Sequence, residues 1–173
     1  MDLTDKVVLI TGARRIGSSV AVTLARQGAN LSLSYNNSNQ EIKHTAELIR
    51  NIGRRVIIIQ SDLTTARDCQ RLVDETVSGL GRLDVLINMA STYTSKPFDE
   101  LTESDWDNGL AVDLKAAFLC TLAAVPHLRA SGRGRIINFS DWVARSGRPR
   151  YKGYLTYYVA KSAVIGLTEA LAL

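Results

Sequence analysis

The stretch Val7-Val8-Leu9-Ile10-Thr11-Gly12-Ala13-Arg14-Arg15-Ile16-Gly17 indicates the class of fold. Its first four residues are apolar and mostly β-branched, which is typical of a strand buried in a parallel sheet. A glycine-containing turn follows and opens a helix, so backbone N–H groups and the positive helix end can face a diphosphate. Gly12 and Gly17 are the candidate binding residues, because a side chain there would hold the phosphates away. An ordinary strand-to-helix turn is the alternative.

Strand-like and helix-like patterns alternate through the rest of the chain. Short apolar runs predict strands at residues 31–35, 56–59, 83–87 and 135–140. Apolar residues at helical spacing predict helices over 16–28, 42–53, 69–80 and 102–125, and a last one from the 153–161 region onward. This alternation predicts an α/β fold: a Rossmann-like, doubly wound parallel sheet with helices on both faces. Residues 1–173 are expected to form a single domain.

The buried faces of two helices are expected from their spacing. Ile16, Val20 and Leu24 mark the apolar stripe of the first helix. The long helix should begin at the start signal Thr102-Glu103-Ser104-Asp105. Its predicted apolar face consists of Trp106, Leu110, Leu114, Ala117, Phe118, Thr121, Leu122 and Val125.

Composition narrows the class of partner. The formal net charge is +4, but the basic residues are scattered and no aromatic-and-basic stripe accompanies them, which argues against nucleic-acid binding. Cys69 and Cys120 are too few for a disulfide framework and lack metal-ligand spacing. The first residues show no signal-peptide pattern, and no apolar run looks long enough to span a membrane. We therefore expect a cytoplasmic protein with a small anionic ligand and no metal.

The end of the second strand bears on the choice of dinucleotide. Sites for NAD often place an acid there to bind the ribose hydroxyls, whereas a nearby basic residue accommodates a 2′-phosphate. Here the strand ends in Tyr35 and Asn36 without an acid, and the turn contains Arg14 and Arg15 followed by Ile16. These residues favour NADP over NAD. The alternative is that both arginines point into solvent.

A second motif is Gly153-Tyr154-Leu155-Thr156-Tyr157-Tyr158-Val159-Ala160-Lys161. On a helix, Tyr157 and Lys161 lie one turn apart on the same face. An ammonium near a phenol lowers the phenol pKa from about 10 towards working pH. Such a tyrosine can pass a proton to a carbonyl oxygen while a cofactor delivers hydride. The pair alone is a weak signal.

Together these motifs resemble those of the short-chain dehydrogenase/reductase family, in the family's order and over the whole chain. The matching elements are Thr11-Gly12…Gly17, Asp62-Leu63, Asn88-x-Ala90, Ile137-Asn138 and Tyr157-x-x-x-Lys161. The resemblance implies that Asp62 and Leu63 border an adenine, and that Asn88 and Ala90 line the ribose side. It also implies that Tyr157 donates the proton while Lys161 binds the nicotinamide ribose. Asp62 could instead cap the helix after Thr64-Thr65.

The chain departs from the family pattern within the site. Arg15 stands where the family has a middle glycine, in a turn one residue shorter, and pteridine reductases resemble it in having a basic residue there. Asp141 stands where the family has a substrate-orienting serine, again as in pteridine reductases; Ser140 could take that role, or Asp141 could only cap the Trp142 loop. Asp113 replaces an asparagine of the proton relay and could pair with Lys161.

The resemblance implies an NADP(H)-dependent oxidoreductase that interconverts a carbonyl and an alcohol. Two alternatives stay open: a pteridine reductase-like activity, and a relative that binds nucleotide without catalysis. Because the chain stops at Leu173 inside an apolar helix, we expect a fragment that lacks the last strands of the family fold. The helices that start near Trp106 and Tyr157 are predicted to form a homodimer or homotetramer interface. Burial beneath the missing part is the other explanation of their apolar faces.

Overall fold

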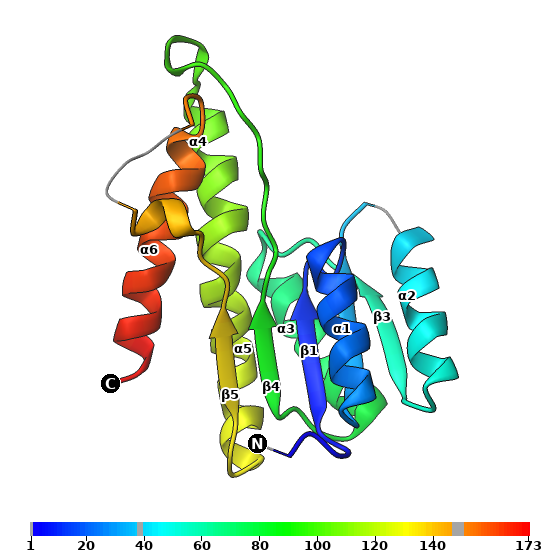
Figure 1. Ribbon diagram of the computed structural model, residues 1–173. Helices are drawn as coiled ribbons and strands as arrows, with labels where there is room; N and C mark the ends of the chain where they lie inside the picture. Colours follow the sequence, from blue (N-terminus) through cyan, green and yellow to red (C-terminus); the bar gives the residue numbers. More distant parts are fainter. Residues whose placement is uncertain (1, 38–39, 147–150) are drawn as a thin grey trace.

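A parallel sheet forms the centre of the fold in the computed structural model, which describes residues 2–37, 40–146 and 151–173 (Figure 1). Its strand order is β3-β2-β1-β4-β5, and every neighbouring pair is parallel. The strands are β1 (Val7–Thr11), β2 (Asn30–Tyr35), β3 (Val56–Gln60), β4 (Val85–Asn88) and β5 (Arg135–Asn138). The predicted α/β class and doubly wound sheet are confirmed. The polar residues Asn36-Asn37-Ser38 predict a turn after β2, but Ser38, like residues 147–150, lies outside the described residues.

The strand order reverses at β1, which positions the site. The chain runs outward from β1 to β2 and β3, and then returns to β4 on the other side of β1. Thr11 at the end of β1 pairs with Asn88 at the end of β4. Ligands of open α/β sheets bind at such a reversal, outside the carboxyl ends of the strands.

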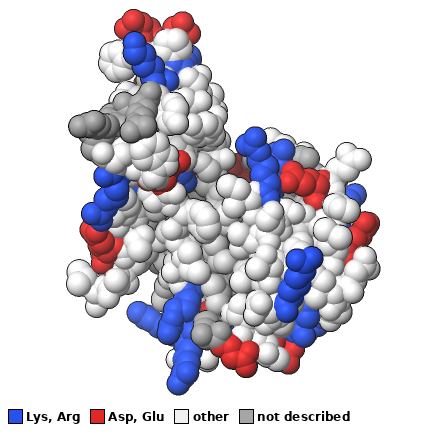
Figure 2. Space-filling view, in the orientation of Figure 1, with Lys and Arg blue, Asp and Glu red and all other residues white. Residues whose placement is uncertain are grey.

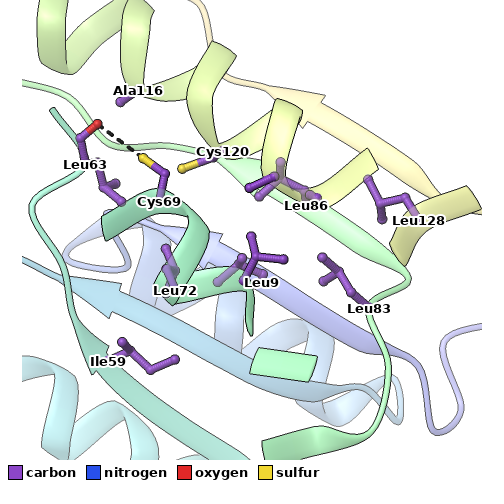
Figure 3. Packing of buried hydrophobic residues seen from close by; sticks show 13 residues of the cluster. Leu9, Ile59, Leu63, Cys69, Leu72, Leu83, Leu86, Ala116, Cys120 and Leu128 are labelled. Carbon is purple, nitrogen blue, oxygen red and sulfur yellow. Dashed lines mark hydrogen bonds between the residues drawn. The ribbon is translucent and has the colours of Figure 1, made fainter. Parts of the chain in front are cut away.

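Helices cover both faces of the sheet (Figure 1). α1 (Ile16–Arg26) and α2 (Gln40–Asn51) pack on one face, and α3 (Ala66–Leu80) and α5 (Ala116–Ala130) on the other. The side chains of β1 alternate between two apolar clusters: Val8 and Ile10 face α1 and α2, whereas Leu9 faces α3 and α5. Figure 3 shows the α3–α5 cluster, where the free thiols of Cys69 and Cys120 lie among leucines.

The buried stripe of α1 differs from the prediction by one position. Gly17, Ala21 and Ala25 are the buried residues, whereas Ile16 is 68% exposed. The prediction is therefore wrong for Ile16, whereas Val20 and Leu24 are half-buried and pack against the edge of the same cluster. Small side chains on the sheet-facing side let the helix approach β1 closely, so bulk is a poor guide to the buried face here.

The long helix consists of three joined segments: α4 (Glu103–Leu110), the π-helical turn η2 (Ala111–Lys115) and α5. Its predicted start is confirmed, since Thr102 and Asp105 form a reciprocal capping box. The predicted apolar face is only partly right. Small residues such as Cys120 and Ala124 are buried, but Phe118 and Leu122 are 46% and 63% exposed. α6 (Leu155–Leu171) packs against α4 and η2, and the short 3₁₀ turns η1 (Phe98–Glu100) and η3 (Trp142–Ala144) complete the described elements.

The continuous helix Glu103–Ala130 is long and apolar enough to cross a membrane by length and composition. The prediction that no apolar run reaches that length is therefore wrong. The reason is that this helix is apolar on its exposed side as well as on the side that packs against α3 and β4. A buried core helix passes the same test.

Candidate active site

A groove of about 750 Å³ lies at the carboxyl edge of the sheet. Figure 2 shows the surface hollowed between the tall part that contains α4 and α6 and the part that contains α1 and α2. The predicted site residues that line the groove are Gly12, Arg14, Arg15, Ile16, Tyr35, Asn36, Asp62, Leu63, Ala90, Ser140, Asp141, Tyr157 and Lys161. Gly17, Asn88 and Asp113 are buried and do not line it.

The glycine turn is held tightly against the end of β4. Thr11 Oγ1 accepts hydrogen bonds from the backbone N–H groups of Met89 and Ala90, at 3.0 and 3.3 Å. Gly12 has a φ of +66°, and a Cβ built there would lie 2.6 Å from the Ala90 Cα. Gly12 is therefore required by the approach of two backbone segments, and the same approach leaves its backbone exposed to the groove.

The two arginines of the turn have an acidic neighbour that sequence reasoning missed. Glu41, in the first turn of α2, accepts a hydrogen bond from the Arg15 backbone N–H at 2.5 Å. Its other carboxylate oxygen lies 3.4 Å from Arg14 Nε. Hydrogen bonding to the Arg15 N–H, together with Arg14, holds the pKa of Glu41 below its usual value. Arg14 is half-exposed, as the solvent alternative predicted, but it is paired.

The residues that follow β3, Ser61 to Thr64, line another part of the groove. Asp62 does not cap α3: its carboxylate accepts from the Thr64 N–H and hydroxyl, whereas Thr65 accepts from Asp68 N–H as the N-cap. Leu63 is nearly buried. The buried hydroxyl of Ser61 also lines the groove and has no hydrogen-bond partner among the described residues, so it is available to a polar ligand.

Asn88 supports the edge of the sheet from within. Its amide group donates a hydrogen bond to Asn138 Oδ1 at 2.8 Å, and its side chain also lies near Thr121. Because Asn88 is buried and does not line the groove, the contact with a ribose implied by the resemblance has no direct basis in this arrangement. Ala90, two residues on, does line the groove.

Tyr157 and Asp141 form the polar pair at the centre of the groove. The Tyr157 hydroxyl donates a hydrogen bond to Asp141 Oδ2 at 2.7 Å, although 16 residues separate the two. Asp141 Oδ1 accepts from the Val143 N–H, so Asp141 also caps η3. Burial and the neighbouring Asp141 carboxylate raise the pKa of Tyr157 above its ordinary value. The expectation that the pKa of Tyr157 is lowered is therefore wrong for this arrangement.

The environment of Lys161 explains why its charge does not lower that pKa. Lys161 is buried, and its Nζ lies 3.5 Å from Asp113 Oδ1 and donates to the Phe139 carbonyl at 3.2 Å. Asp113 is itself held by Thr92 and by a short hydrogen bond from Ser91. The predicted Asp113–Lys161 pair is confirmed, and Asp113 neutralises much of the charge that would favour a phenolate.

Ser140 is turned away from a substrate-orienting role. Its hydroxyl donates to the Lys161 backbone carbonyl at 2.7 Å, where it ties the end of β5 to α6. Of Ser140 and Asp141, the two candidates for orienting the substrate, only Asp141 forms a hydrogen bond with Tyr157 among the described contacts.

Tyrosine rings flank the polar pair, a feature that sequence reasoning also missed. Tyr93 stacks on Tyr154 with 4.4 Å between ring centroids and meets Tyr157 edge-on at 5.0 Å. The two loops that contain Tyr93 and Tyr154 are joined by a hydrogen bond from Lys96 N–H to the Gly153 carbonyl, at 2.8 Å. The wall of the groove next to Tyr157 is therefore aromatic, and a backbone hydrogen bond between the two loops holds it in place.

Comparisons with known proteins agree with this geometry. A family model for short chain dehydrogenases matches residues 6–173. An uncharacterized oxidoreductase of Thermotoga maritima is 38% identical over 173 residues, covering 99% of this chain and 66% of that protein. The 3-oxoacyl-(acyl-carrier-protein) reductase FabG of Staphylococcus aureus is 34% identical, covering 96% and 67%. The crystal structure of the NADH-dependent reductase A1-R′ complexed with NAD has a TM-score of 0.90 at 27% identity, covering 98% and 72%. The chain spans about two thirds of the length of these relatives, and it belongs to the short-chain dehydrogenase/reductase family.

Proposed function

We propose that this chain is the dinucleotide-binding and catalytic part of an NADP(H)-dependent oxidoreductase that interconverts a carbonyl and an alcohol. The observation that supports this most strongly is the position of the Tyr157 hydroxyl, which opens into the same groove as the glycine turn. The proton donor and the backbone that would bind the phosphates thus line one continuous groove, at the point where the strand order reverses.

The residues of the groove fit a dinucleotide. Gly12 presents backbone where a side chain cannot be accommodated, and the Ser61 hydroxyl lines the same groove without a hydrogen-bond partner in the described part of the chain. Arg14 would meet a 2′-phosphate, and no acid stands at the end of β2, which supports NADP. The relative A1-R′ is described as NADH-dependent, so cofactor preference needs direct measurement.

The bound nicotinamide would supply or accept the hydride at the substrate carbon. In the reducing direction, the Tyr157 hydroxyl gives its proton to the carbonyl oxygen, so that the C=O double bond becomes C–H and O–H. A raised pKa keeps that proton on the phenol at neutral pH. Asp141 holds the hydroxyl in place, and Lys161 lies 5.6 Å from the centre of the Tyr157 ring.

Two alternatives have a specific observation behind them. The hydrogen bond between Asp141 and Tyr157 favours a pteridine reductase-like activity, in which an acid and a tyrosine act together. Neutralisation of Lys161 by Asp113 favours a protein that binds nucleotide without turnover. Assays of a dihydropterin against simple ketones separate the first alternative, and NADPH binding without oxidation across a carbonyl panel would support the second.

The test of the leading proposal is Tyr157→Phe in the full-length protein. Loss of the proton donor should lower kcat by about 10²–10⁴-fold. The dissociation constant for NADPH should stay near that of the wild type, because the phosphate-binding turn is unchanged. Tyr158→Phe is the matched control, since it removes a neighbouring hydroxyl outside the groove lining. Normal turnover by Tyr157→Phe would overturn the assignment.

We also propose a cytoplasmic homodimer or homotetramer that acts on a small-molecule substrate. The support is the exposed apolar surface of α5, where Phe118 and Leu122 face outward.

A further inference from the structure

Glu41 lies outside the expected motifs but contacts the phosphate-binding turn directly. Its two carboxylate oxygens bridge the turn: one accepts the Arg15 backbone N–H at 2.5 Å, and the other lies 3.4 Å from Arg14 Nε. Arg15 has a φ of +51°, which a residue with a side chain rarely adopts. The Glu41 contact therefore holds the turn at its most strained residue, where the family has a glycine.

The backbone of Glu41, in the first turn of α2, is connected to α1 through Thr45. Its backbone carbonyl accepts the Thr45 hydroxyl at 2.9 Å, and Thr45 Oγ1 lies 2.6 Å from Ser18 Oγ. Because the Thr45 proton is used on Glu41, Ser18 is the donor in the second bond. A chain of hydrogen bonds thus connects α1 to the backbone of Glu41, so the part of α2 that carries the carboxylate is joined to α1.

The charge of Glu41 opposes the role of Arg14. Arg14 is the guanidinium that would meet a 2′-phosphate, yet an ionised carboxylate already neutralises it. A phosphate that approaches Arg14 meets the repulsion of that carboxylate as well as the attraction of the guanidinium. Figure 2 shows basic and acidic side chains side by side on the rim of the hollow, over the start of α1 and α2.

We infer that Glu41 is a specificity-determining residue: its carboxylate positions the shortened glycine turn and weakens the binding of a 2′-phosphorylated dinucleotide relative to one with a free 2′-hydroxyl. The inference rests on the dinucleotide groove of the proposed function, and it adds a residue on α2 to the cofactor choice. Specificity here is a difference between two affinities, set by repulsion as much as by attraction.

The experiment compares Glu41→Gln and Glu41→Ala in the full-length protein by calorimetric titration with NADP⁺ and NAD⁺, so that binding is read without turnover. Gln keeps an oxygen for the Arg15 N–H but removes the charge. We expect Glu41→Gln to bind NADP⁺ about tenfold more tightly at low salt, and NAD⁺ about as tightly as the wild type. Glu41→Ala also loses the acceptor, so its affinity for NAD⁺ should fall about two- to tenfold.

The controls use residues of the same region. Glu47→Gln removes an exposed acid further along α2 and should leave both affinities unchanged. Arg14→Ala added to Glu41→Gln should abolish the gain for NADP⁺, because the freed guanidinium is its source. The inference would be overturned if Glu41→Gln changed the affinities for NADP⁺ and NAD⁺ equally, or changed neither. That result would leave the Tyr157→Phe test of the proposed function unaffected. Failure of the wild type to bind either dinucleotide would overturn the proposed function as well.

Discussion

Tyr157 is bound to the carboxylate of Asp141, while Lys161 is bound to a different carboxylate, that of Asp113. The phenol is therefore surrounded by more negative charge than the Tyr-x-x-x-Lys spacing implies. Burial disfavours the phenolate further, and both effects keep the proton on Tyr157. A donor of this kind suits the reduction of a carbonyl better than the oxidation of an alcohol at neutral pH.

The substitution Asp141→Asn should lower the pKa of Tyr157, since it removes the adjacent negative charge while the burial of the phenol remains. The raised pKa means that the folded state keeps the phenolic proton more tightly than the unfolded state does. Its contribution to stability is therefore complete below about pH 10 and is lost as the pH rises above it. Ultraviolet difference absorbance of the phenolate measures the titration. Subtracting the Tyr157→Phe titration identifies the signal, and an unchanged midpoint in Asp141→Asn would contradict the assigned cause.

Among the elements, the π-helical turn η2 places the side chain of Asp113. It interrupts the long helix over Ala111–Lys115 and brings Asp113 to Lys161. Single π turns inside α-helices occur often at functional sites. The loops that contain Tyr93 and Gly153 also shape the site, because a backbone hydrogen bond joins them next to Tyr157.

Gly153→Ala should separate these two loops. Gly153 has a φ of +84°, and a Cβ there would lie 2.5 Å from Ser95 Oγ and 3.3 Å from the Lys96 backbone N and O. We expect a loss of about 1–3 kcal/mol in the free energy of unfolding, measured by urea denaturation, from backbone strain and the clash. The KM for substrate should rise, because the aromatic wall beside Tyr157 is displaced.

Gly132→Ala is the matched control for that variant. Gly132 has a similar φ of +78°, but a Cβ there meets nothing within 4 Å. It therefore measures the cost of the backbone conformation alone, and the difference between the two variants measures the close approach of the loops. Equal losses in the two variants would show that the loop contact contributes nothing.

For the whole molecule, the unexplained feature is the apolar surface on the side of α5 that faces away from the sheet. Phe118 and Leu122 are exposed there, and Leu155 and Leu171 are exposed on α6. Large apolar side chains exposed one turn apart on a helix, such as Phe118 and Leu122, mark an interface between proteins or a surface that another segment covers. Since the chain spans about two thirds of its relatives, the full-length protein is the material for the test.

We expect the double variant Phe118→Glu/Leu122→Glu to dissociate the oligomer of the full-length protein, because burying two carboxylates in an interface is costly. Light scattering coupled to size-exclusion chromatography measures the mass, which should fall to that of a monomer. Leu48→Glu places a charge at a half-exposed leucine of α2, on the opposite face of the sheet, and should leave the mass unchanged. A monomeric wild type would disprove the interface.

The amino-acid sequence alone determined the order of strands and helices, the strand–turn–helix unit at Gly12 and the one-turn spacing of Tyr157 and Lys161. These features are local: the buried strand β1 is apolar from Val7 to Ile10, and a capping box such as Thr102–Asp105 is complete within four residues. The family resemblance depended on the same short motifs.

The tertiary structure alone decided which face of α1 is buried, which parts of the long helix stay exposed and which charges meet in the groove. Small residues on α1 pack against the sheet while Ile16 is exposed, because fit depends on the surface opposite. Glu41 reaches Arg15 from α2, and Asp141 reaches Tyr157 across a loop, in spite of long separations in sequence. Electrostatic energies depend on distance in space and on burial, and neither quantity is contained in the spacing of residues along a chain.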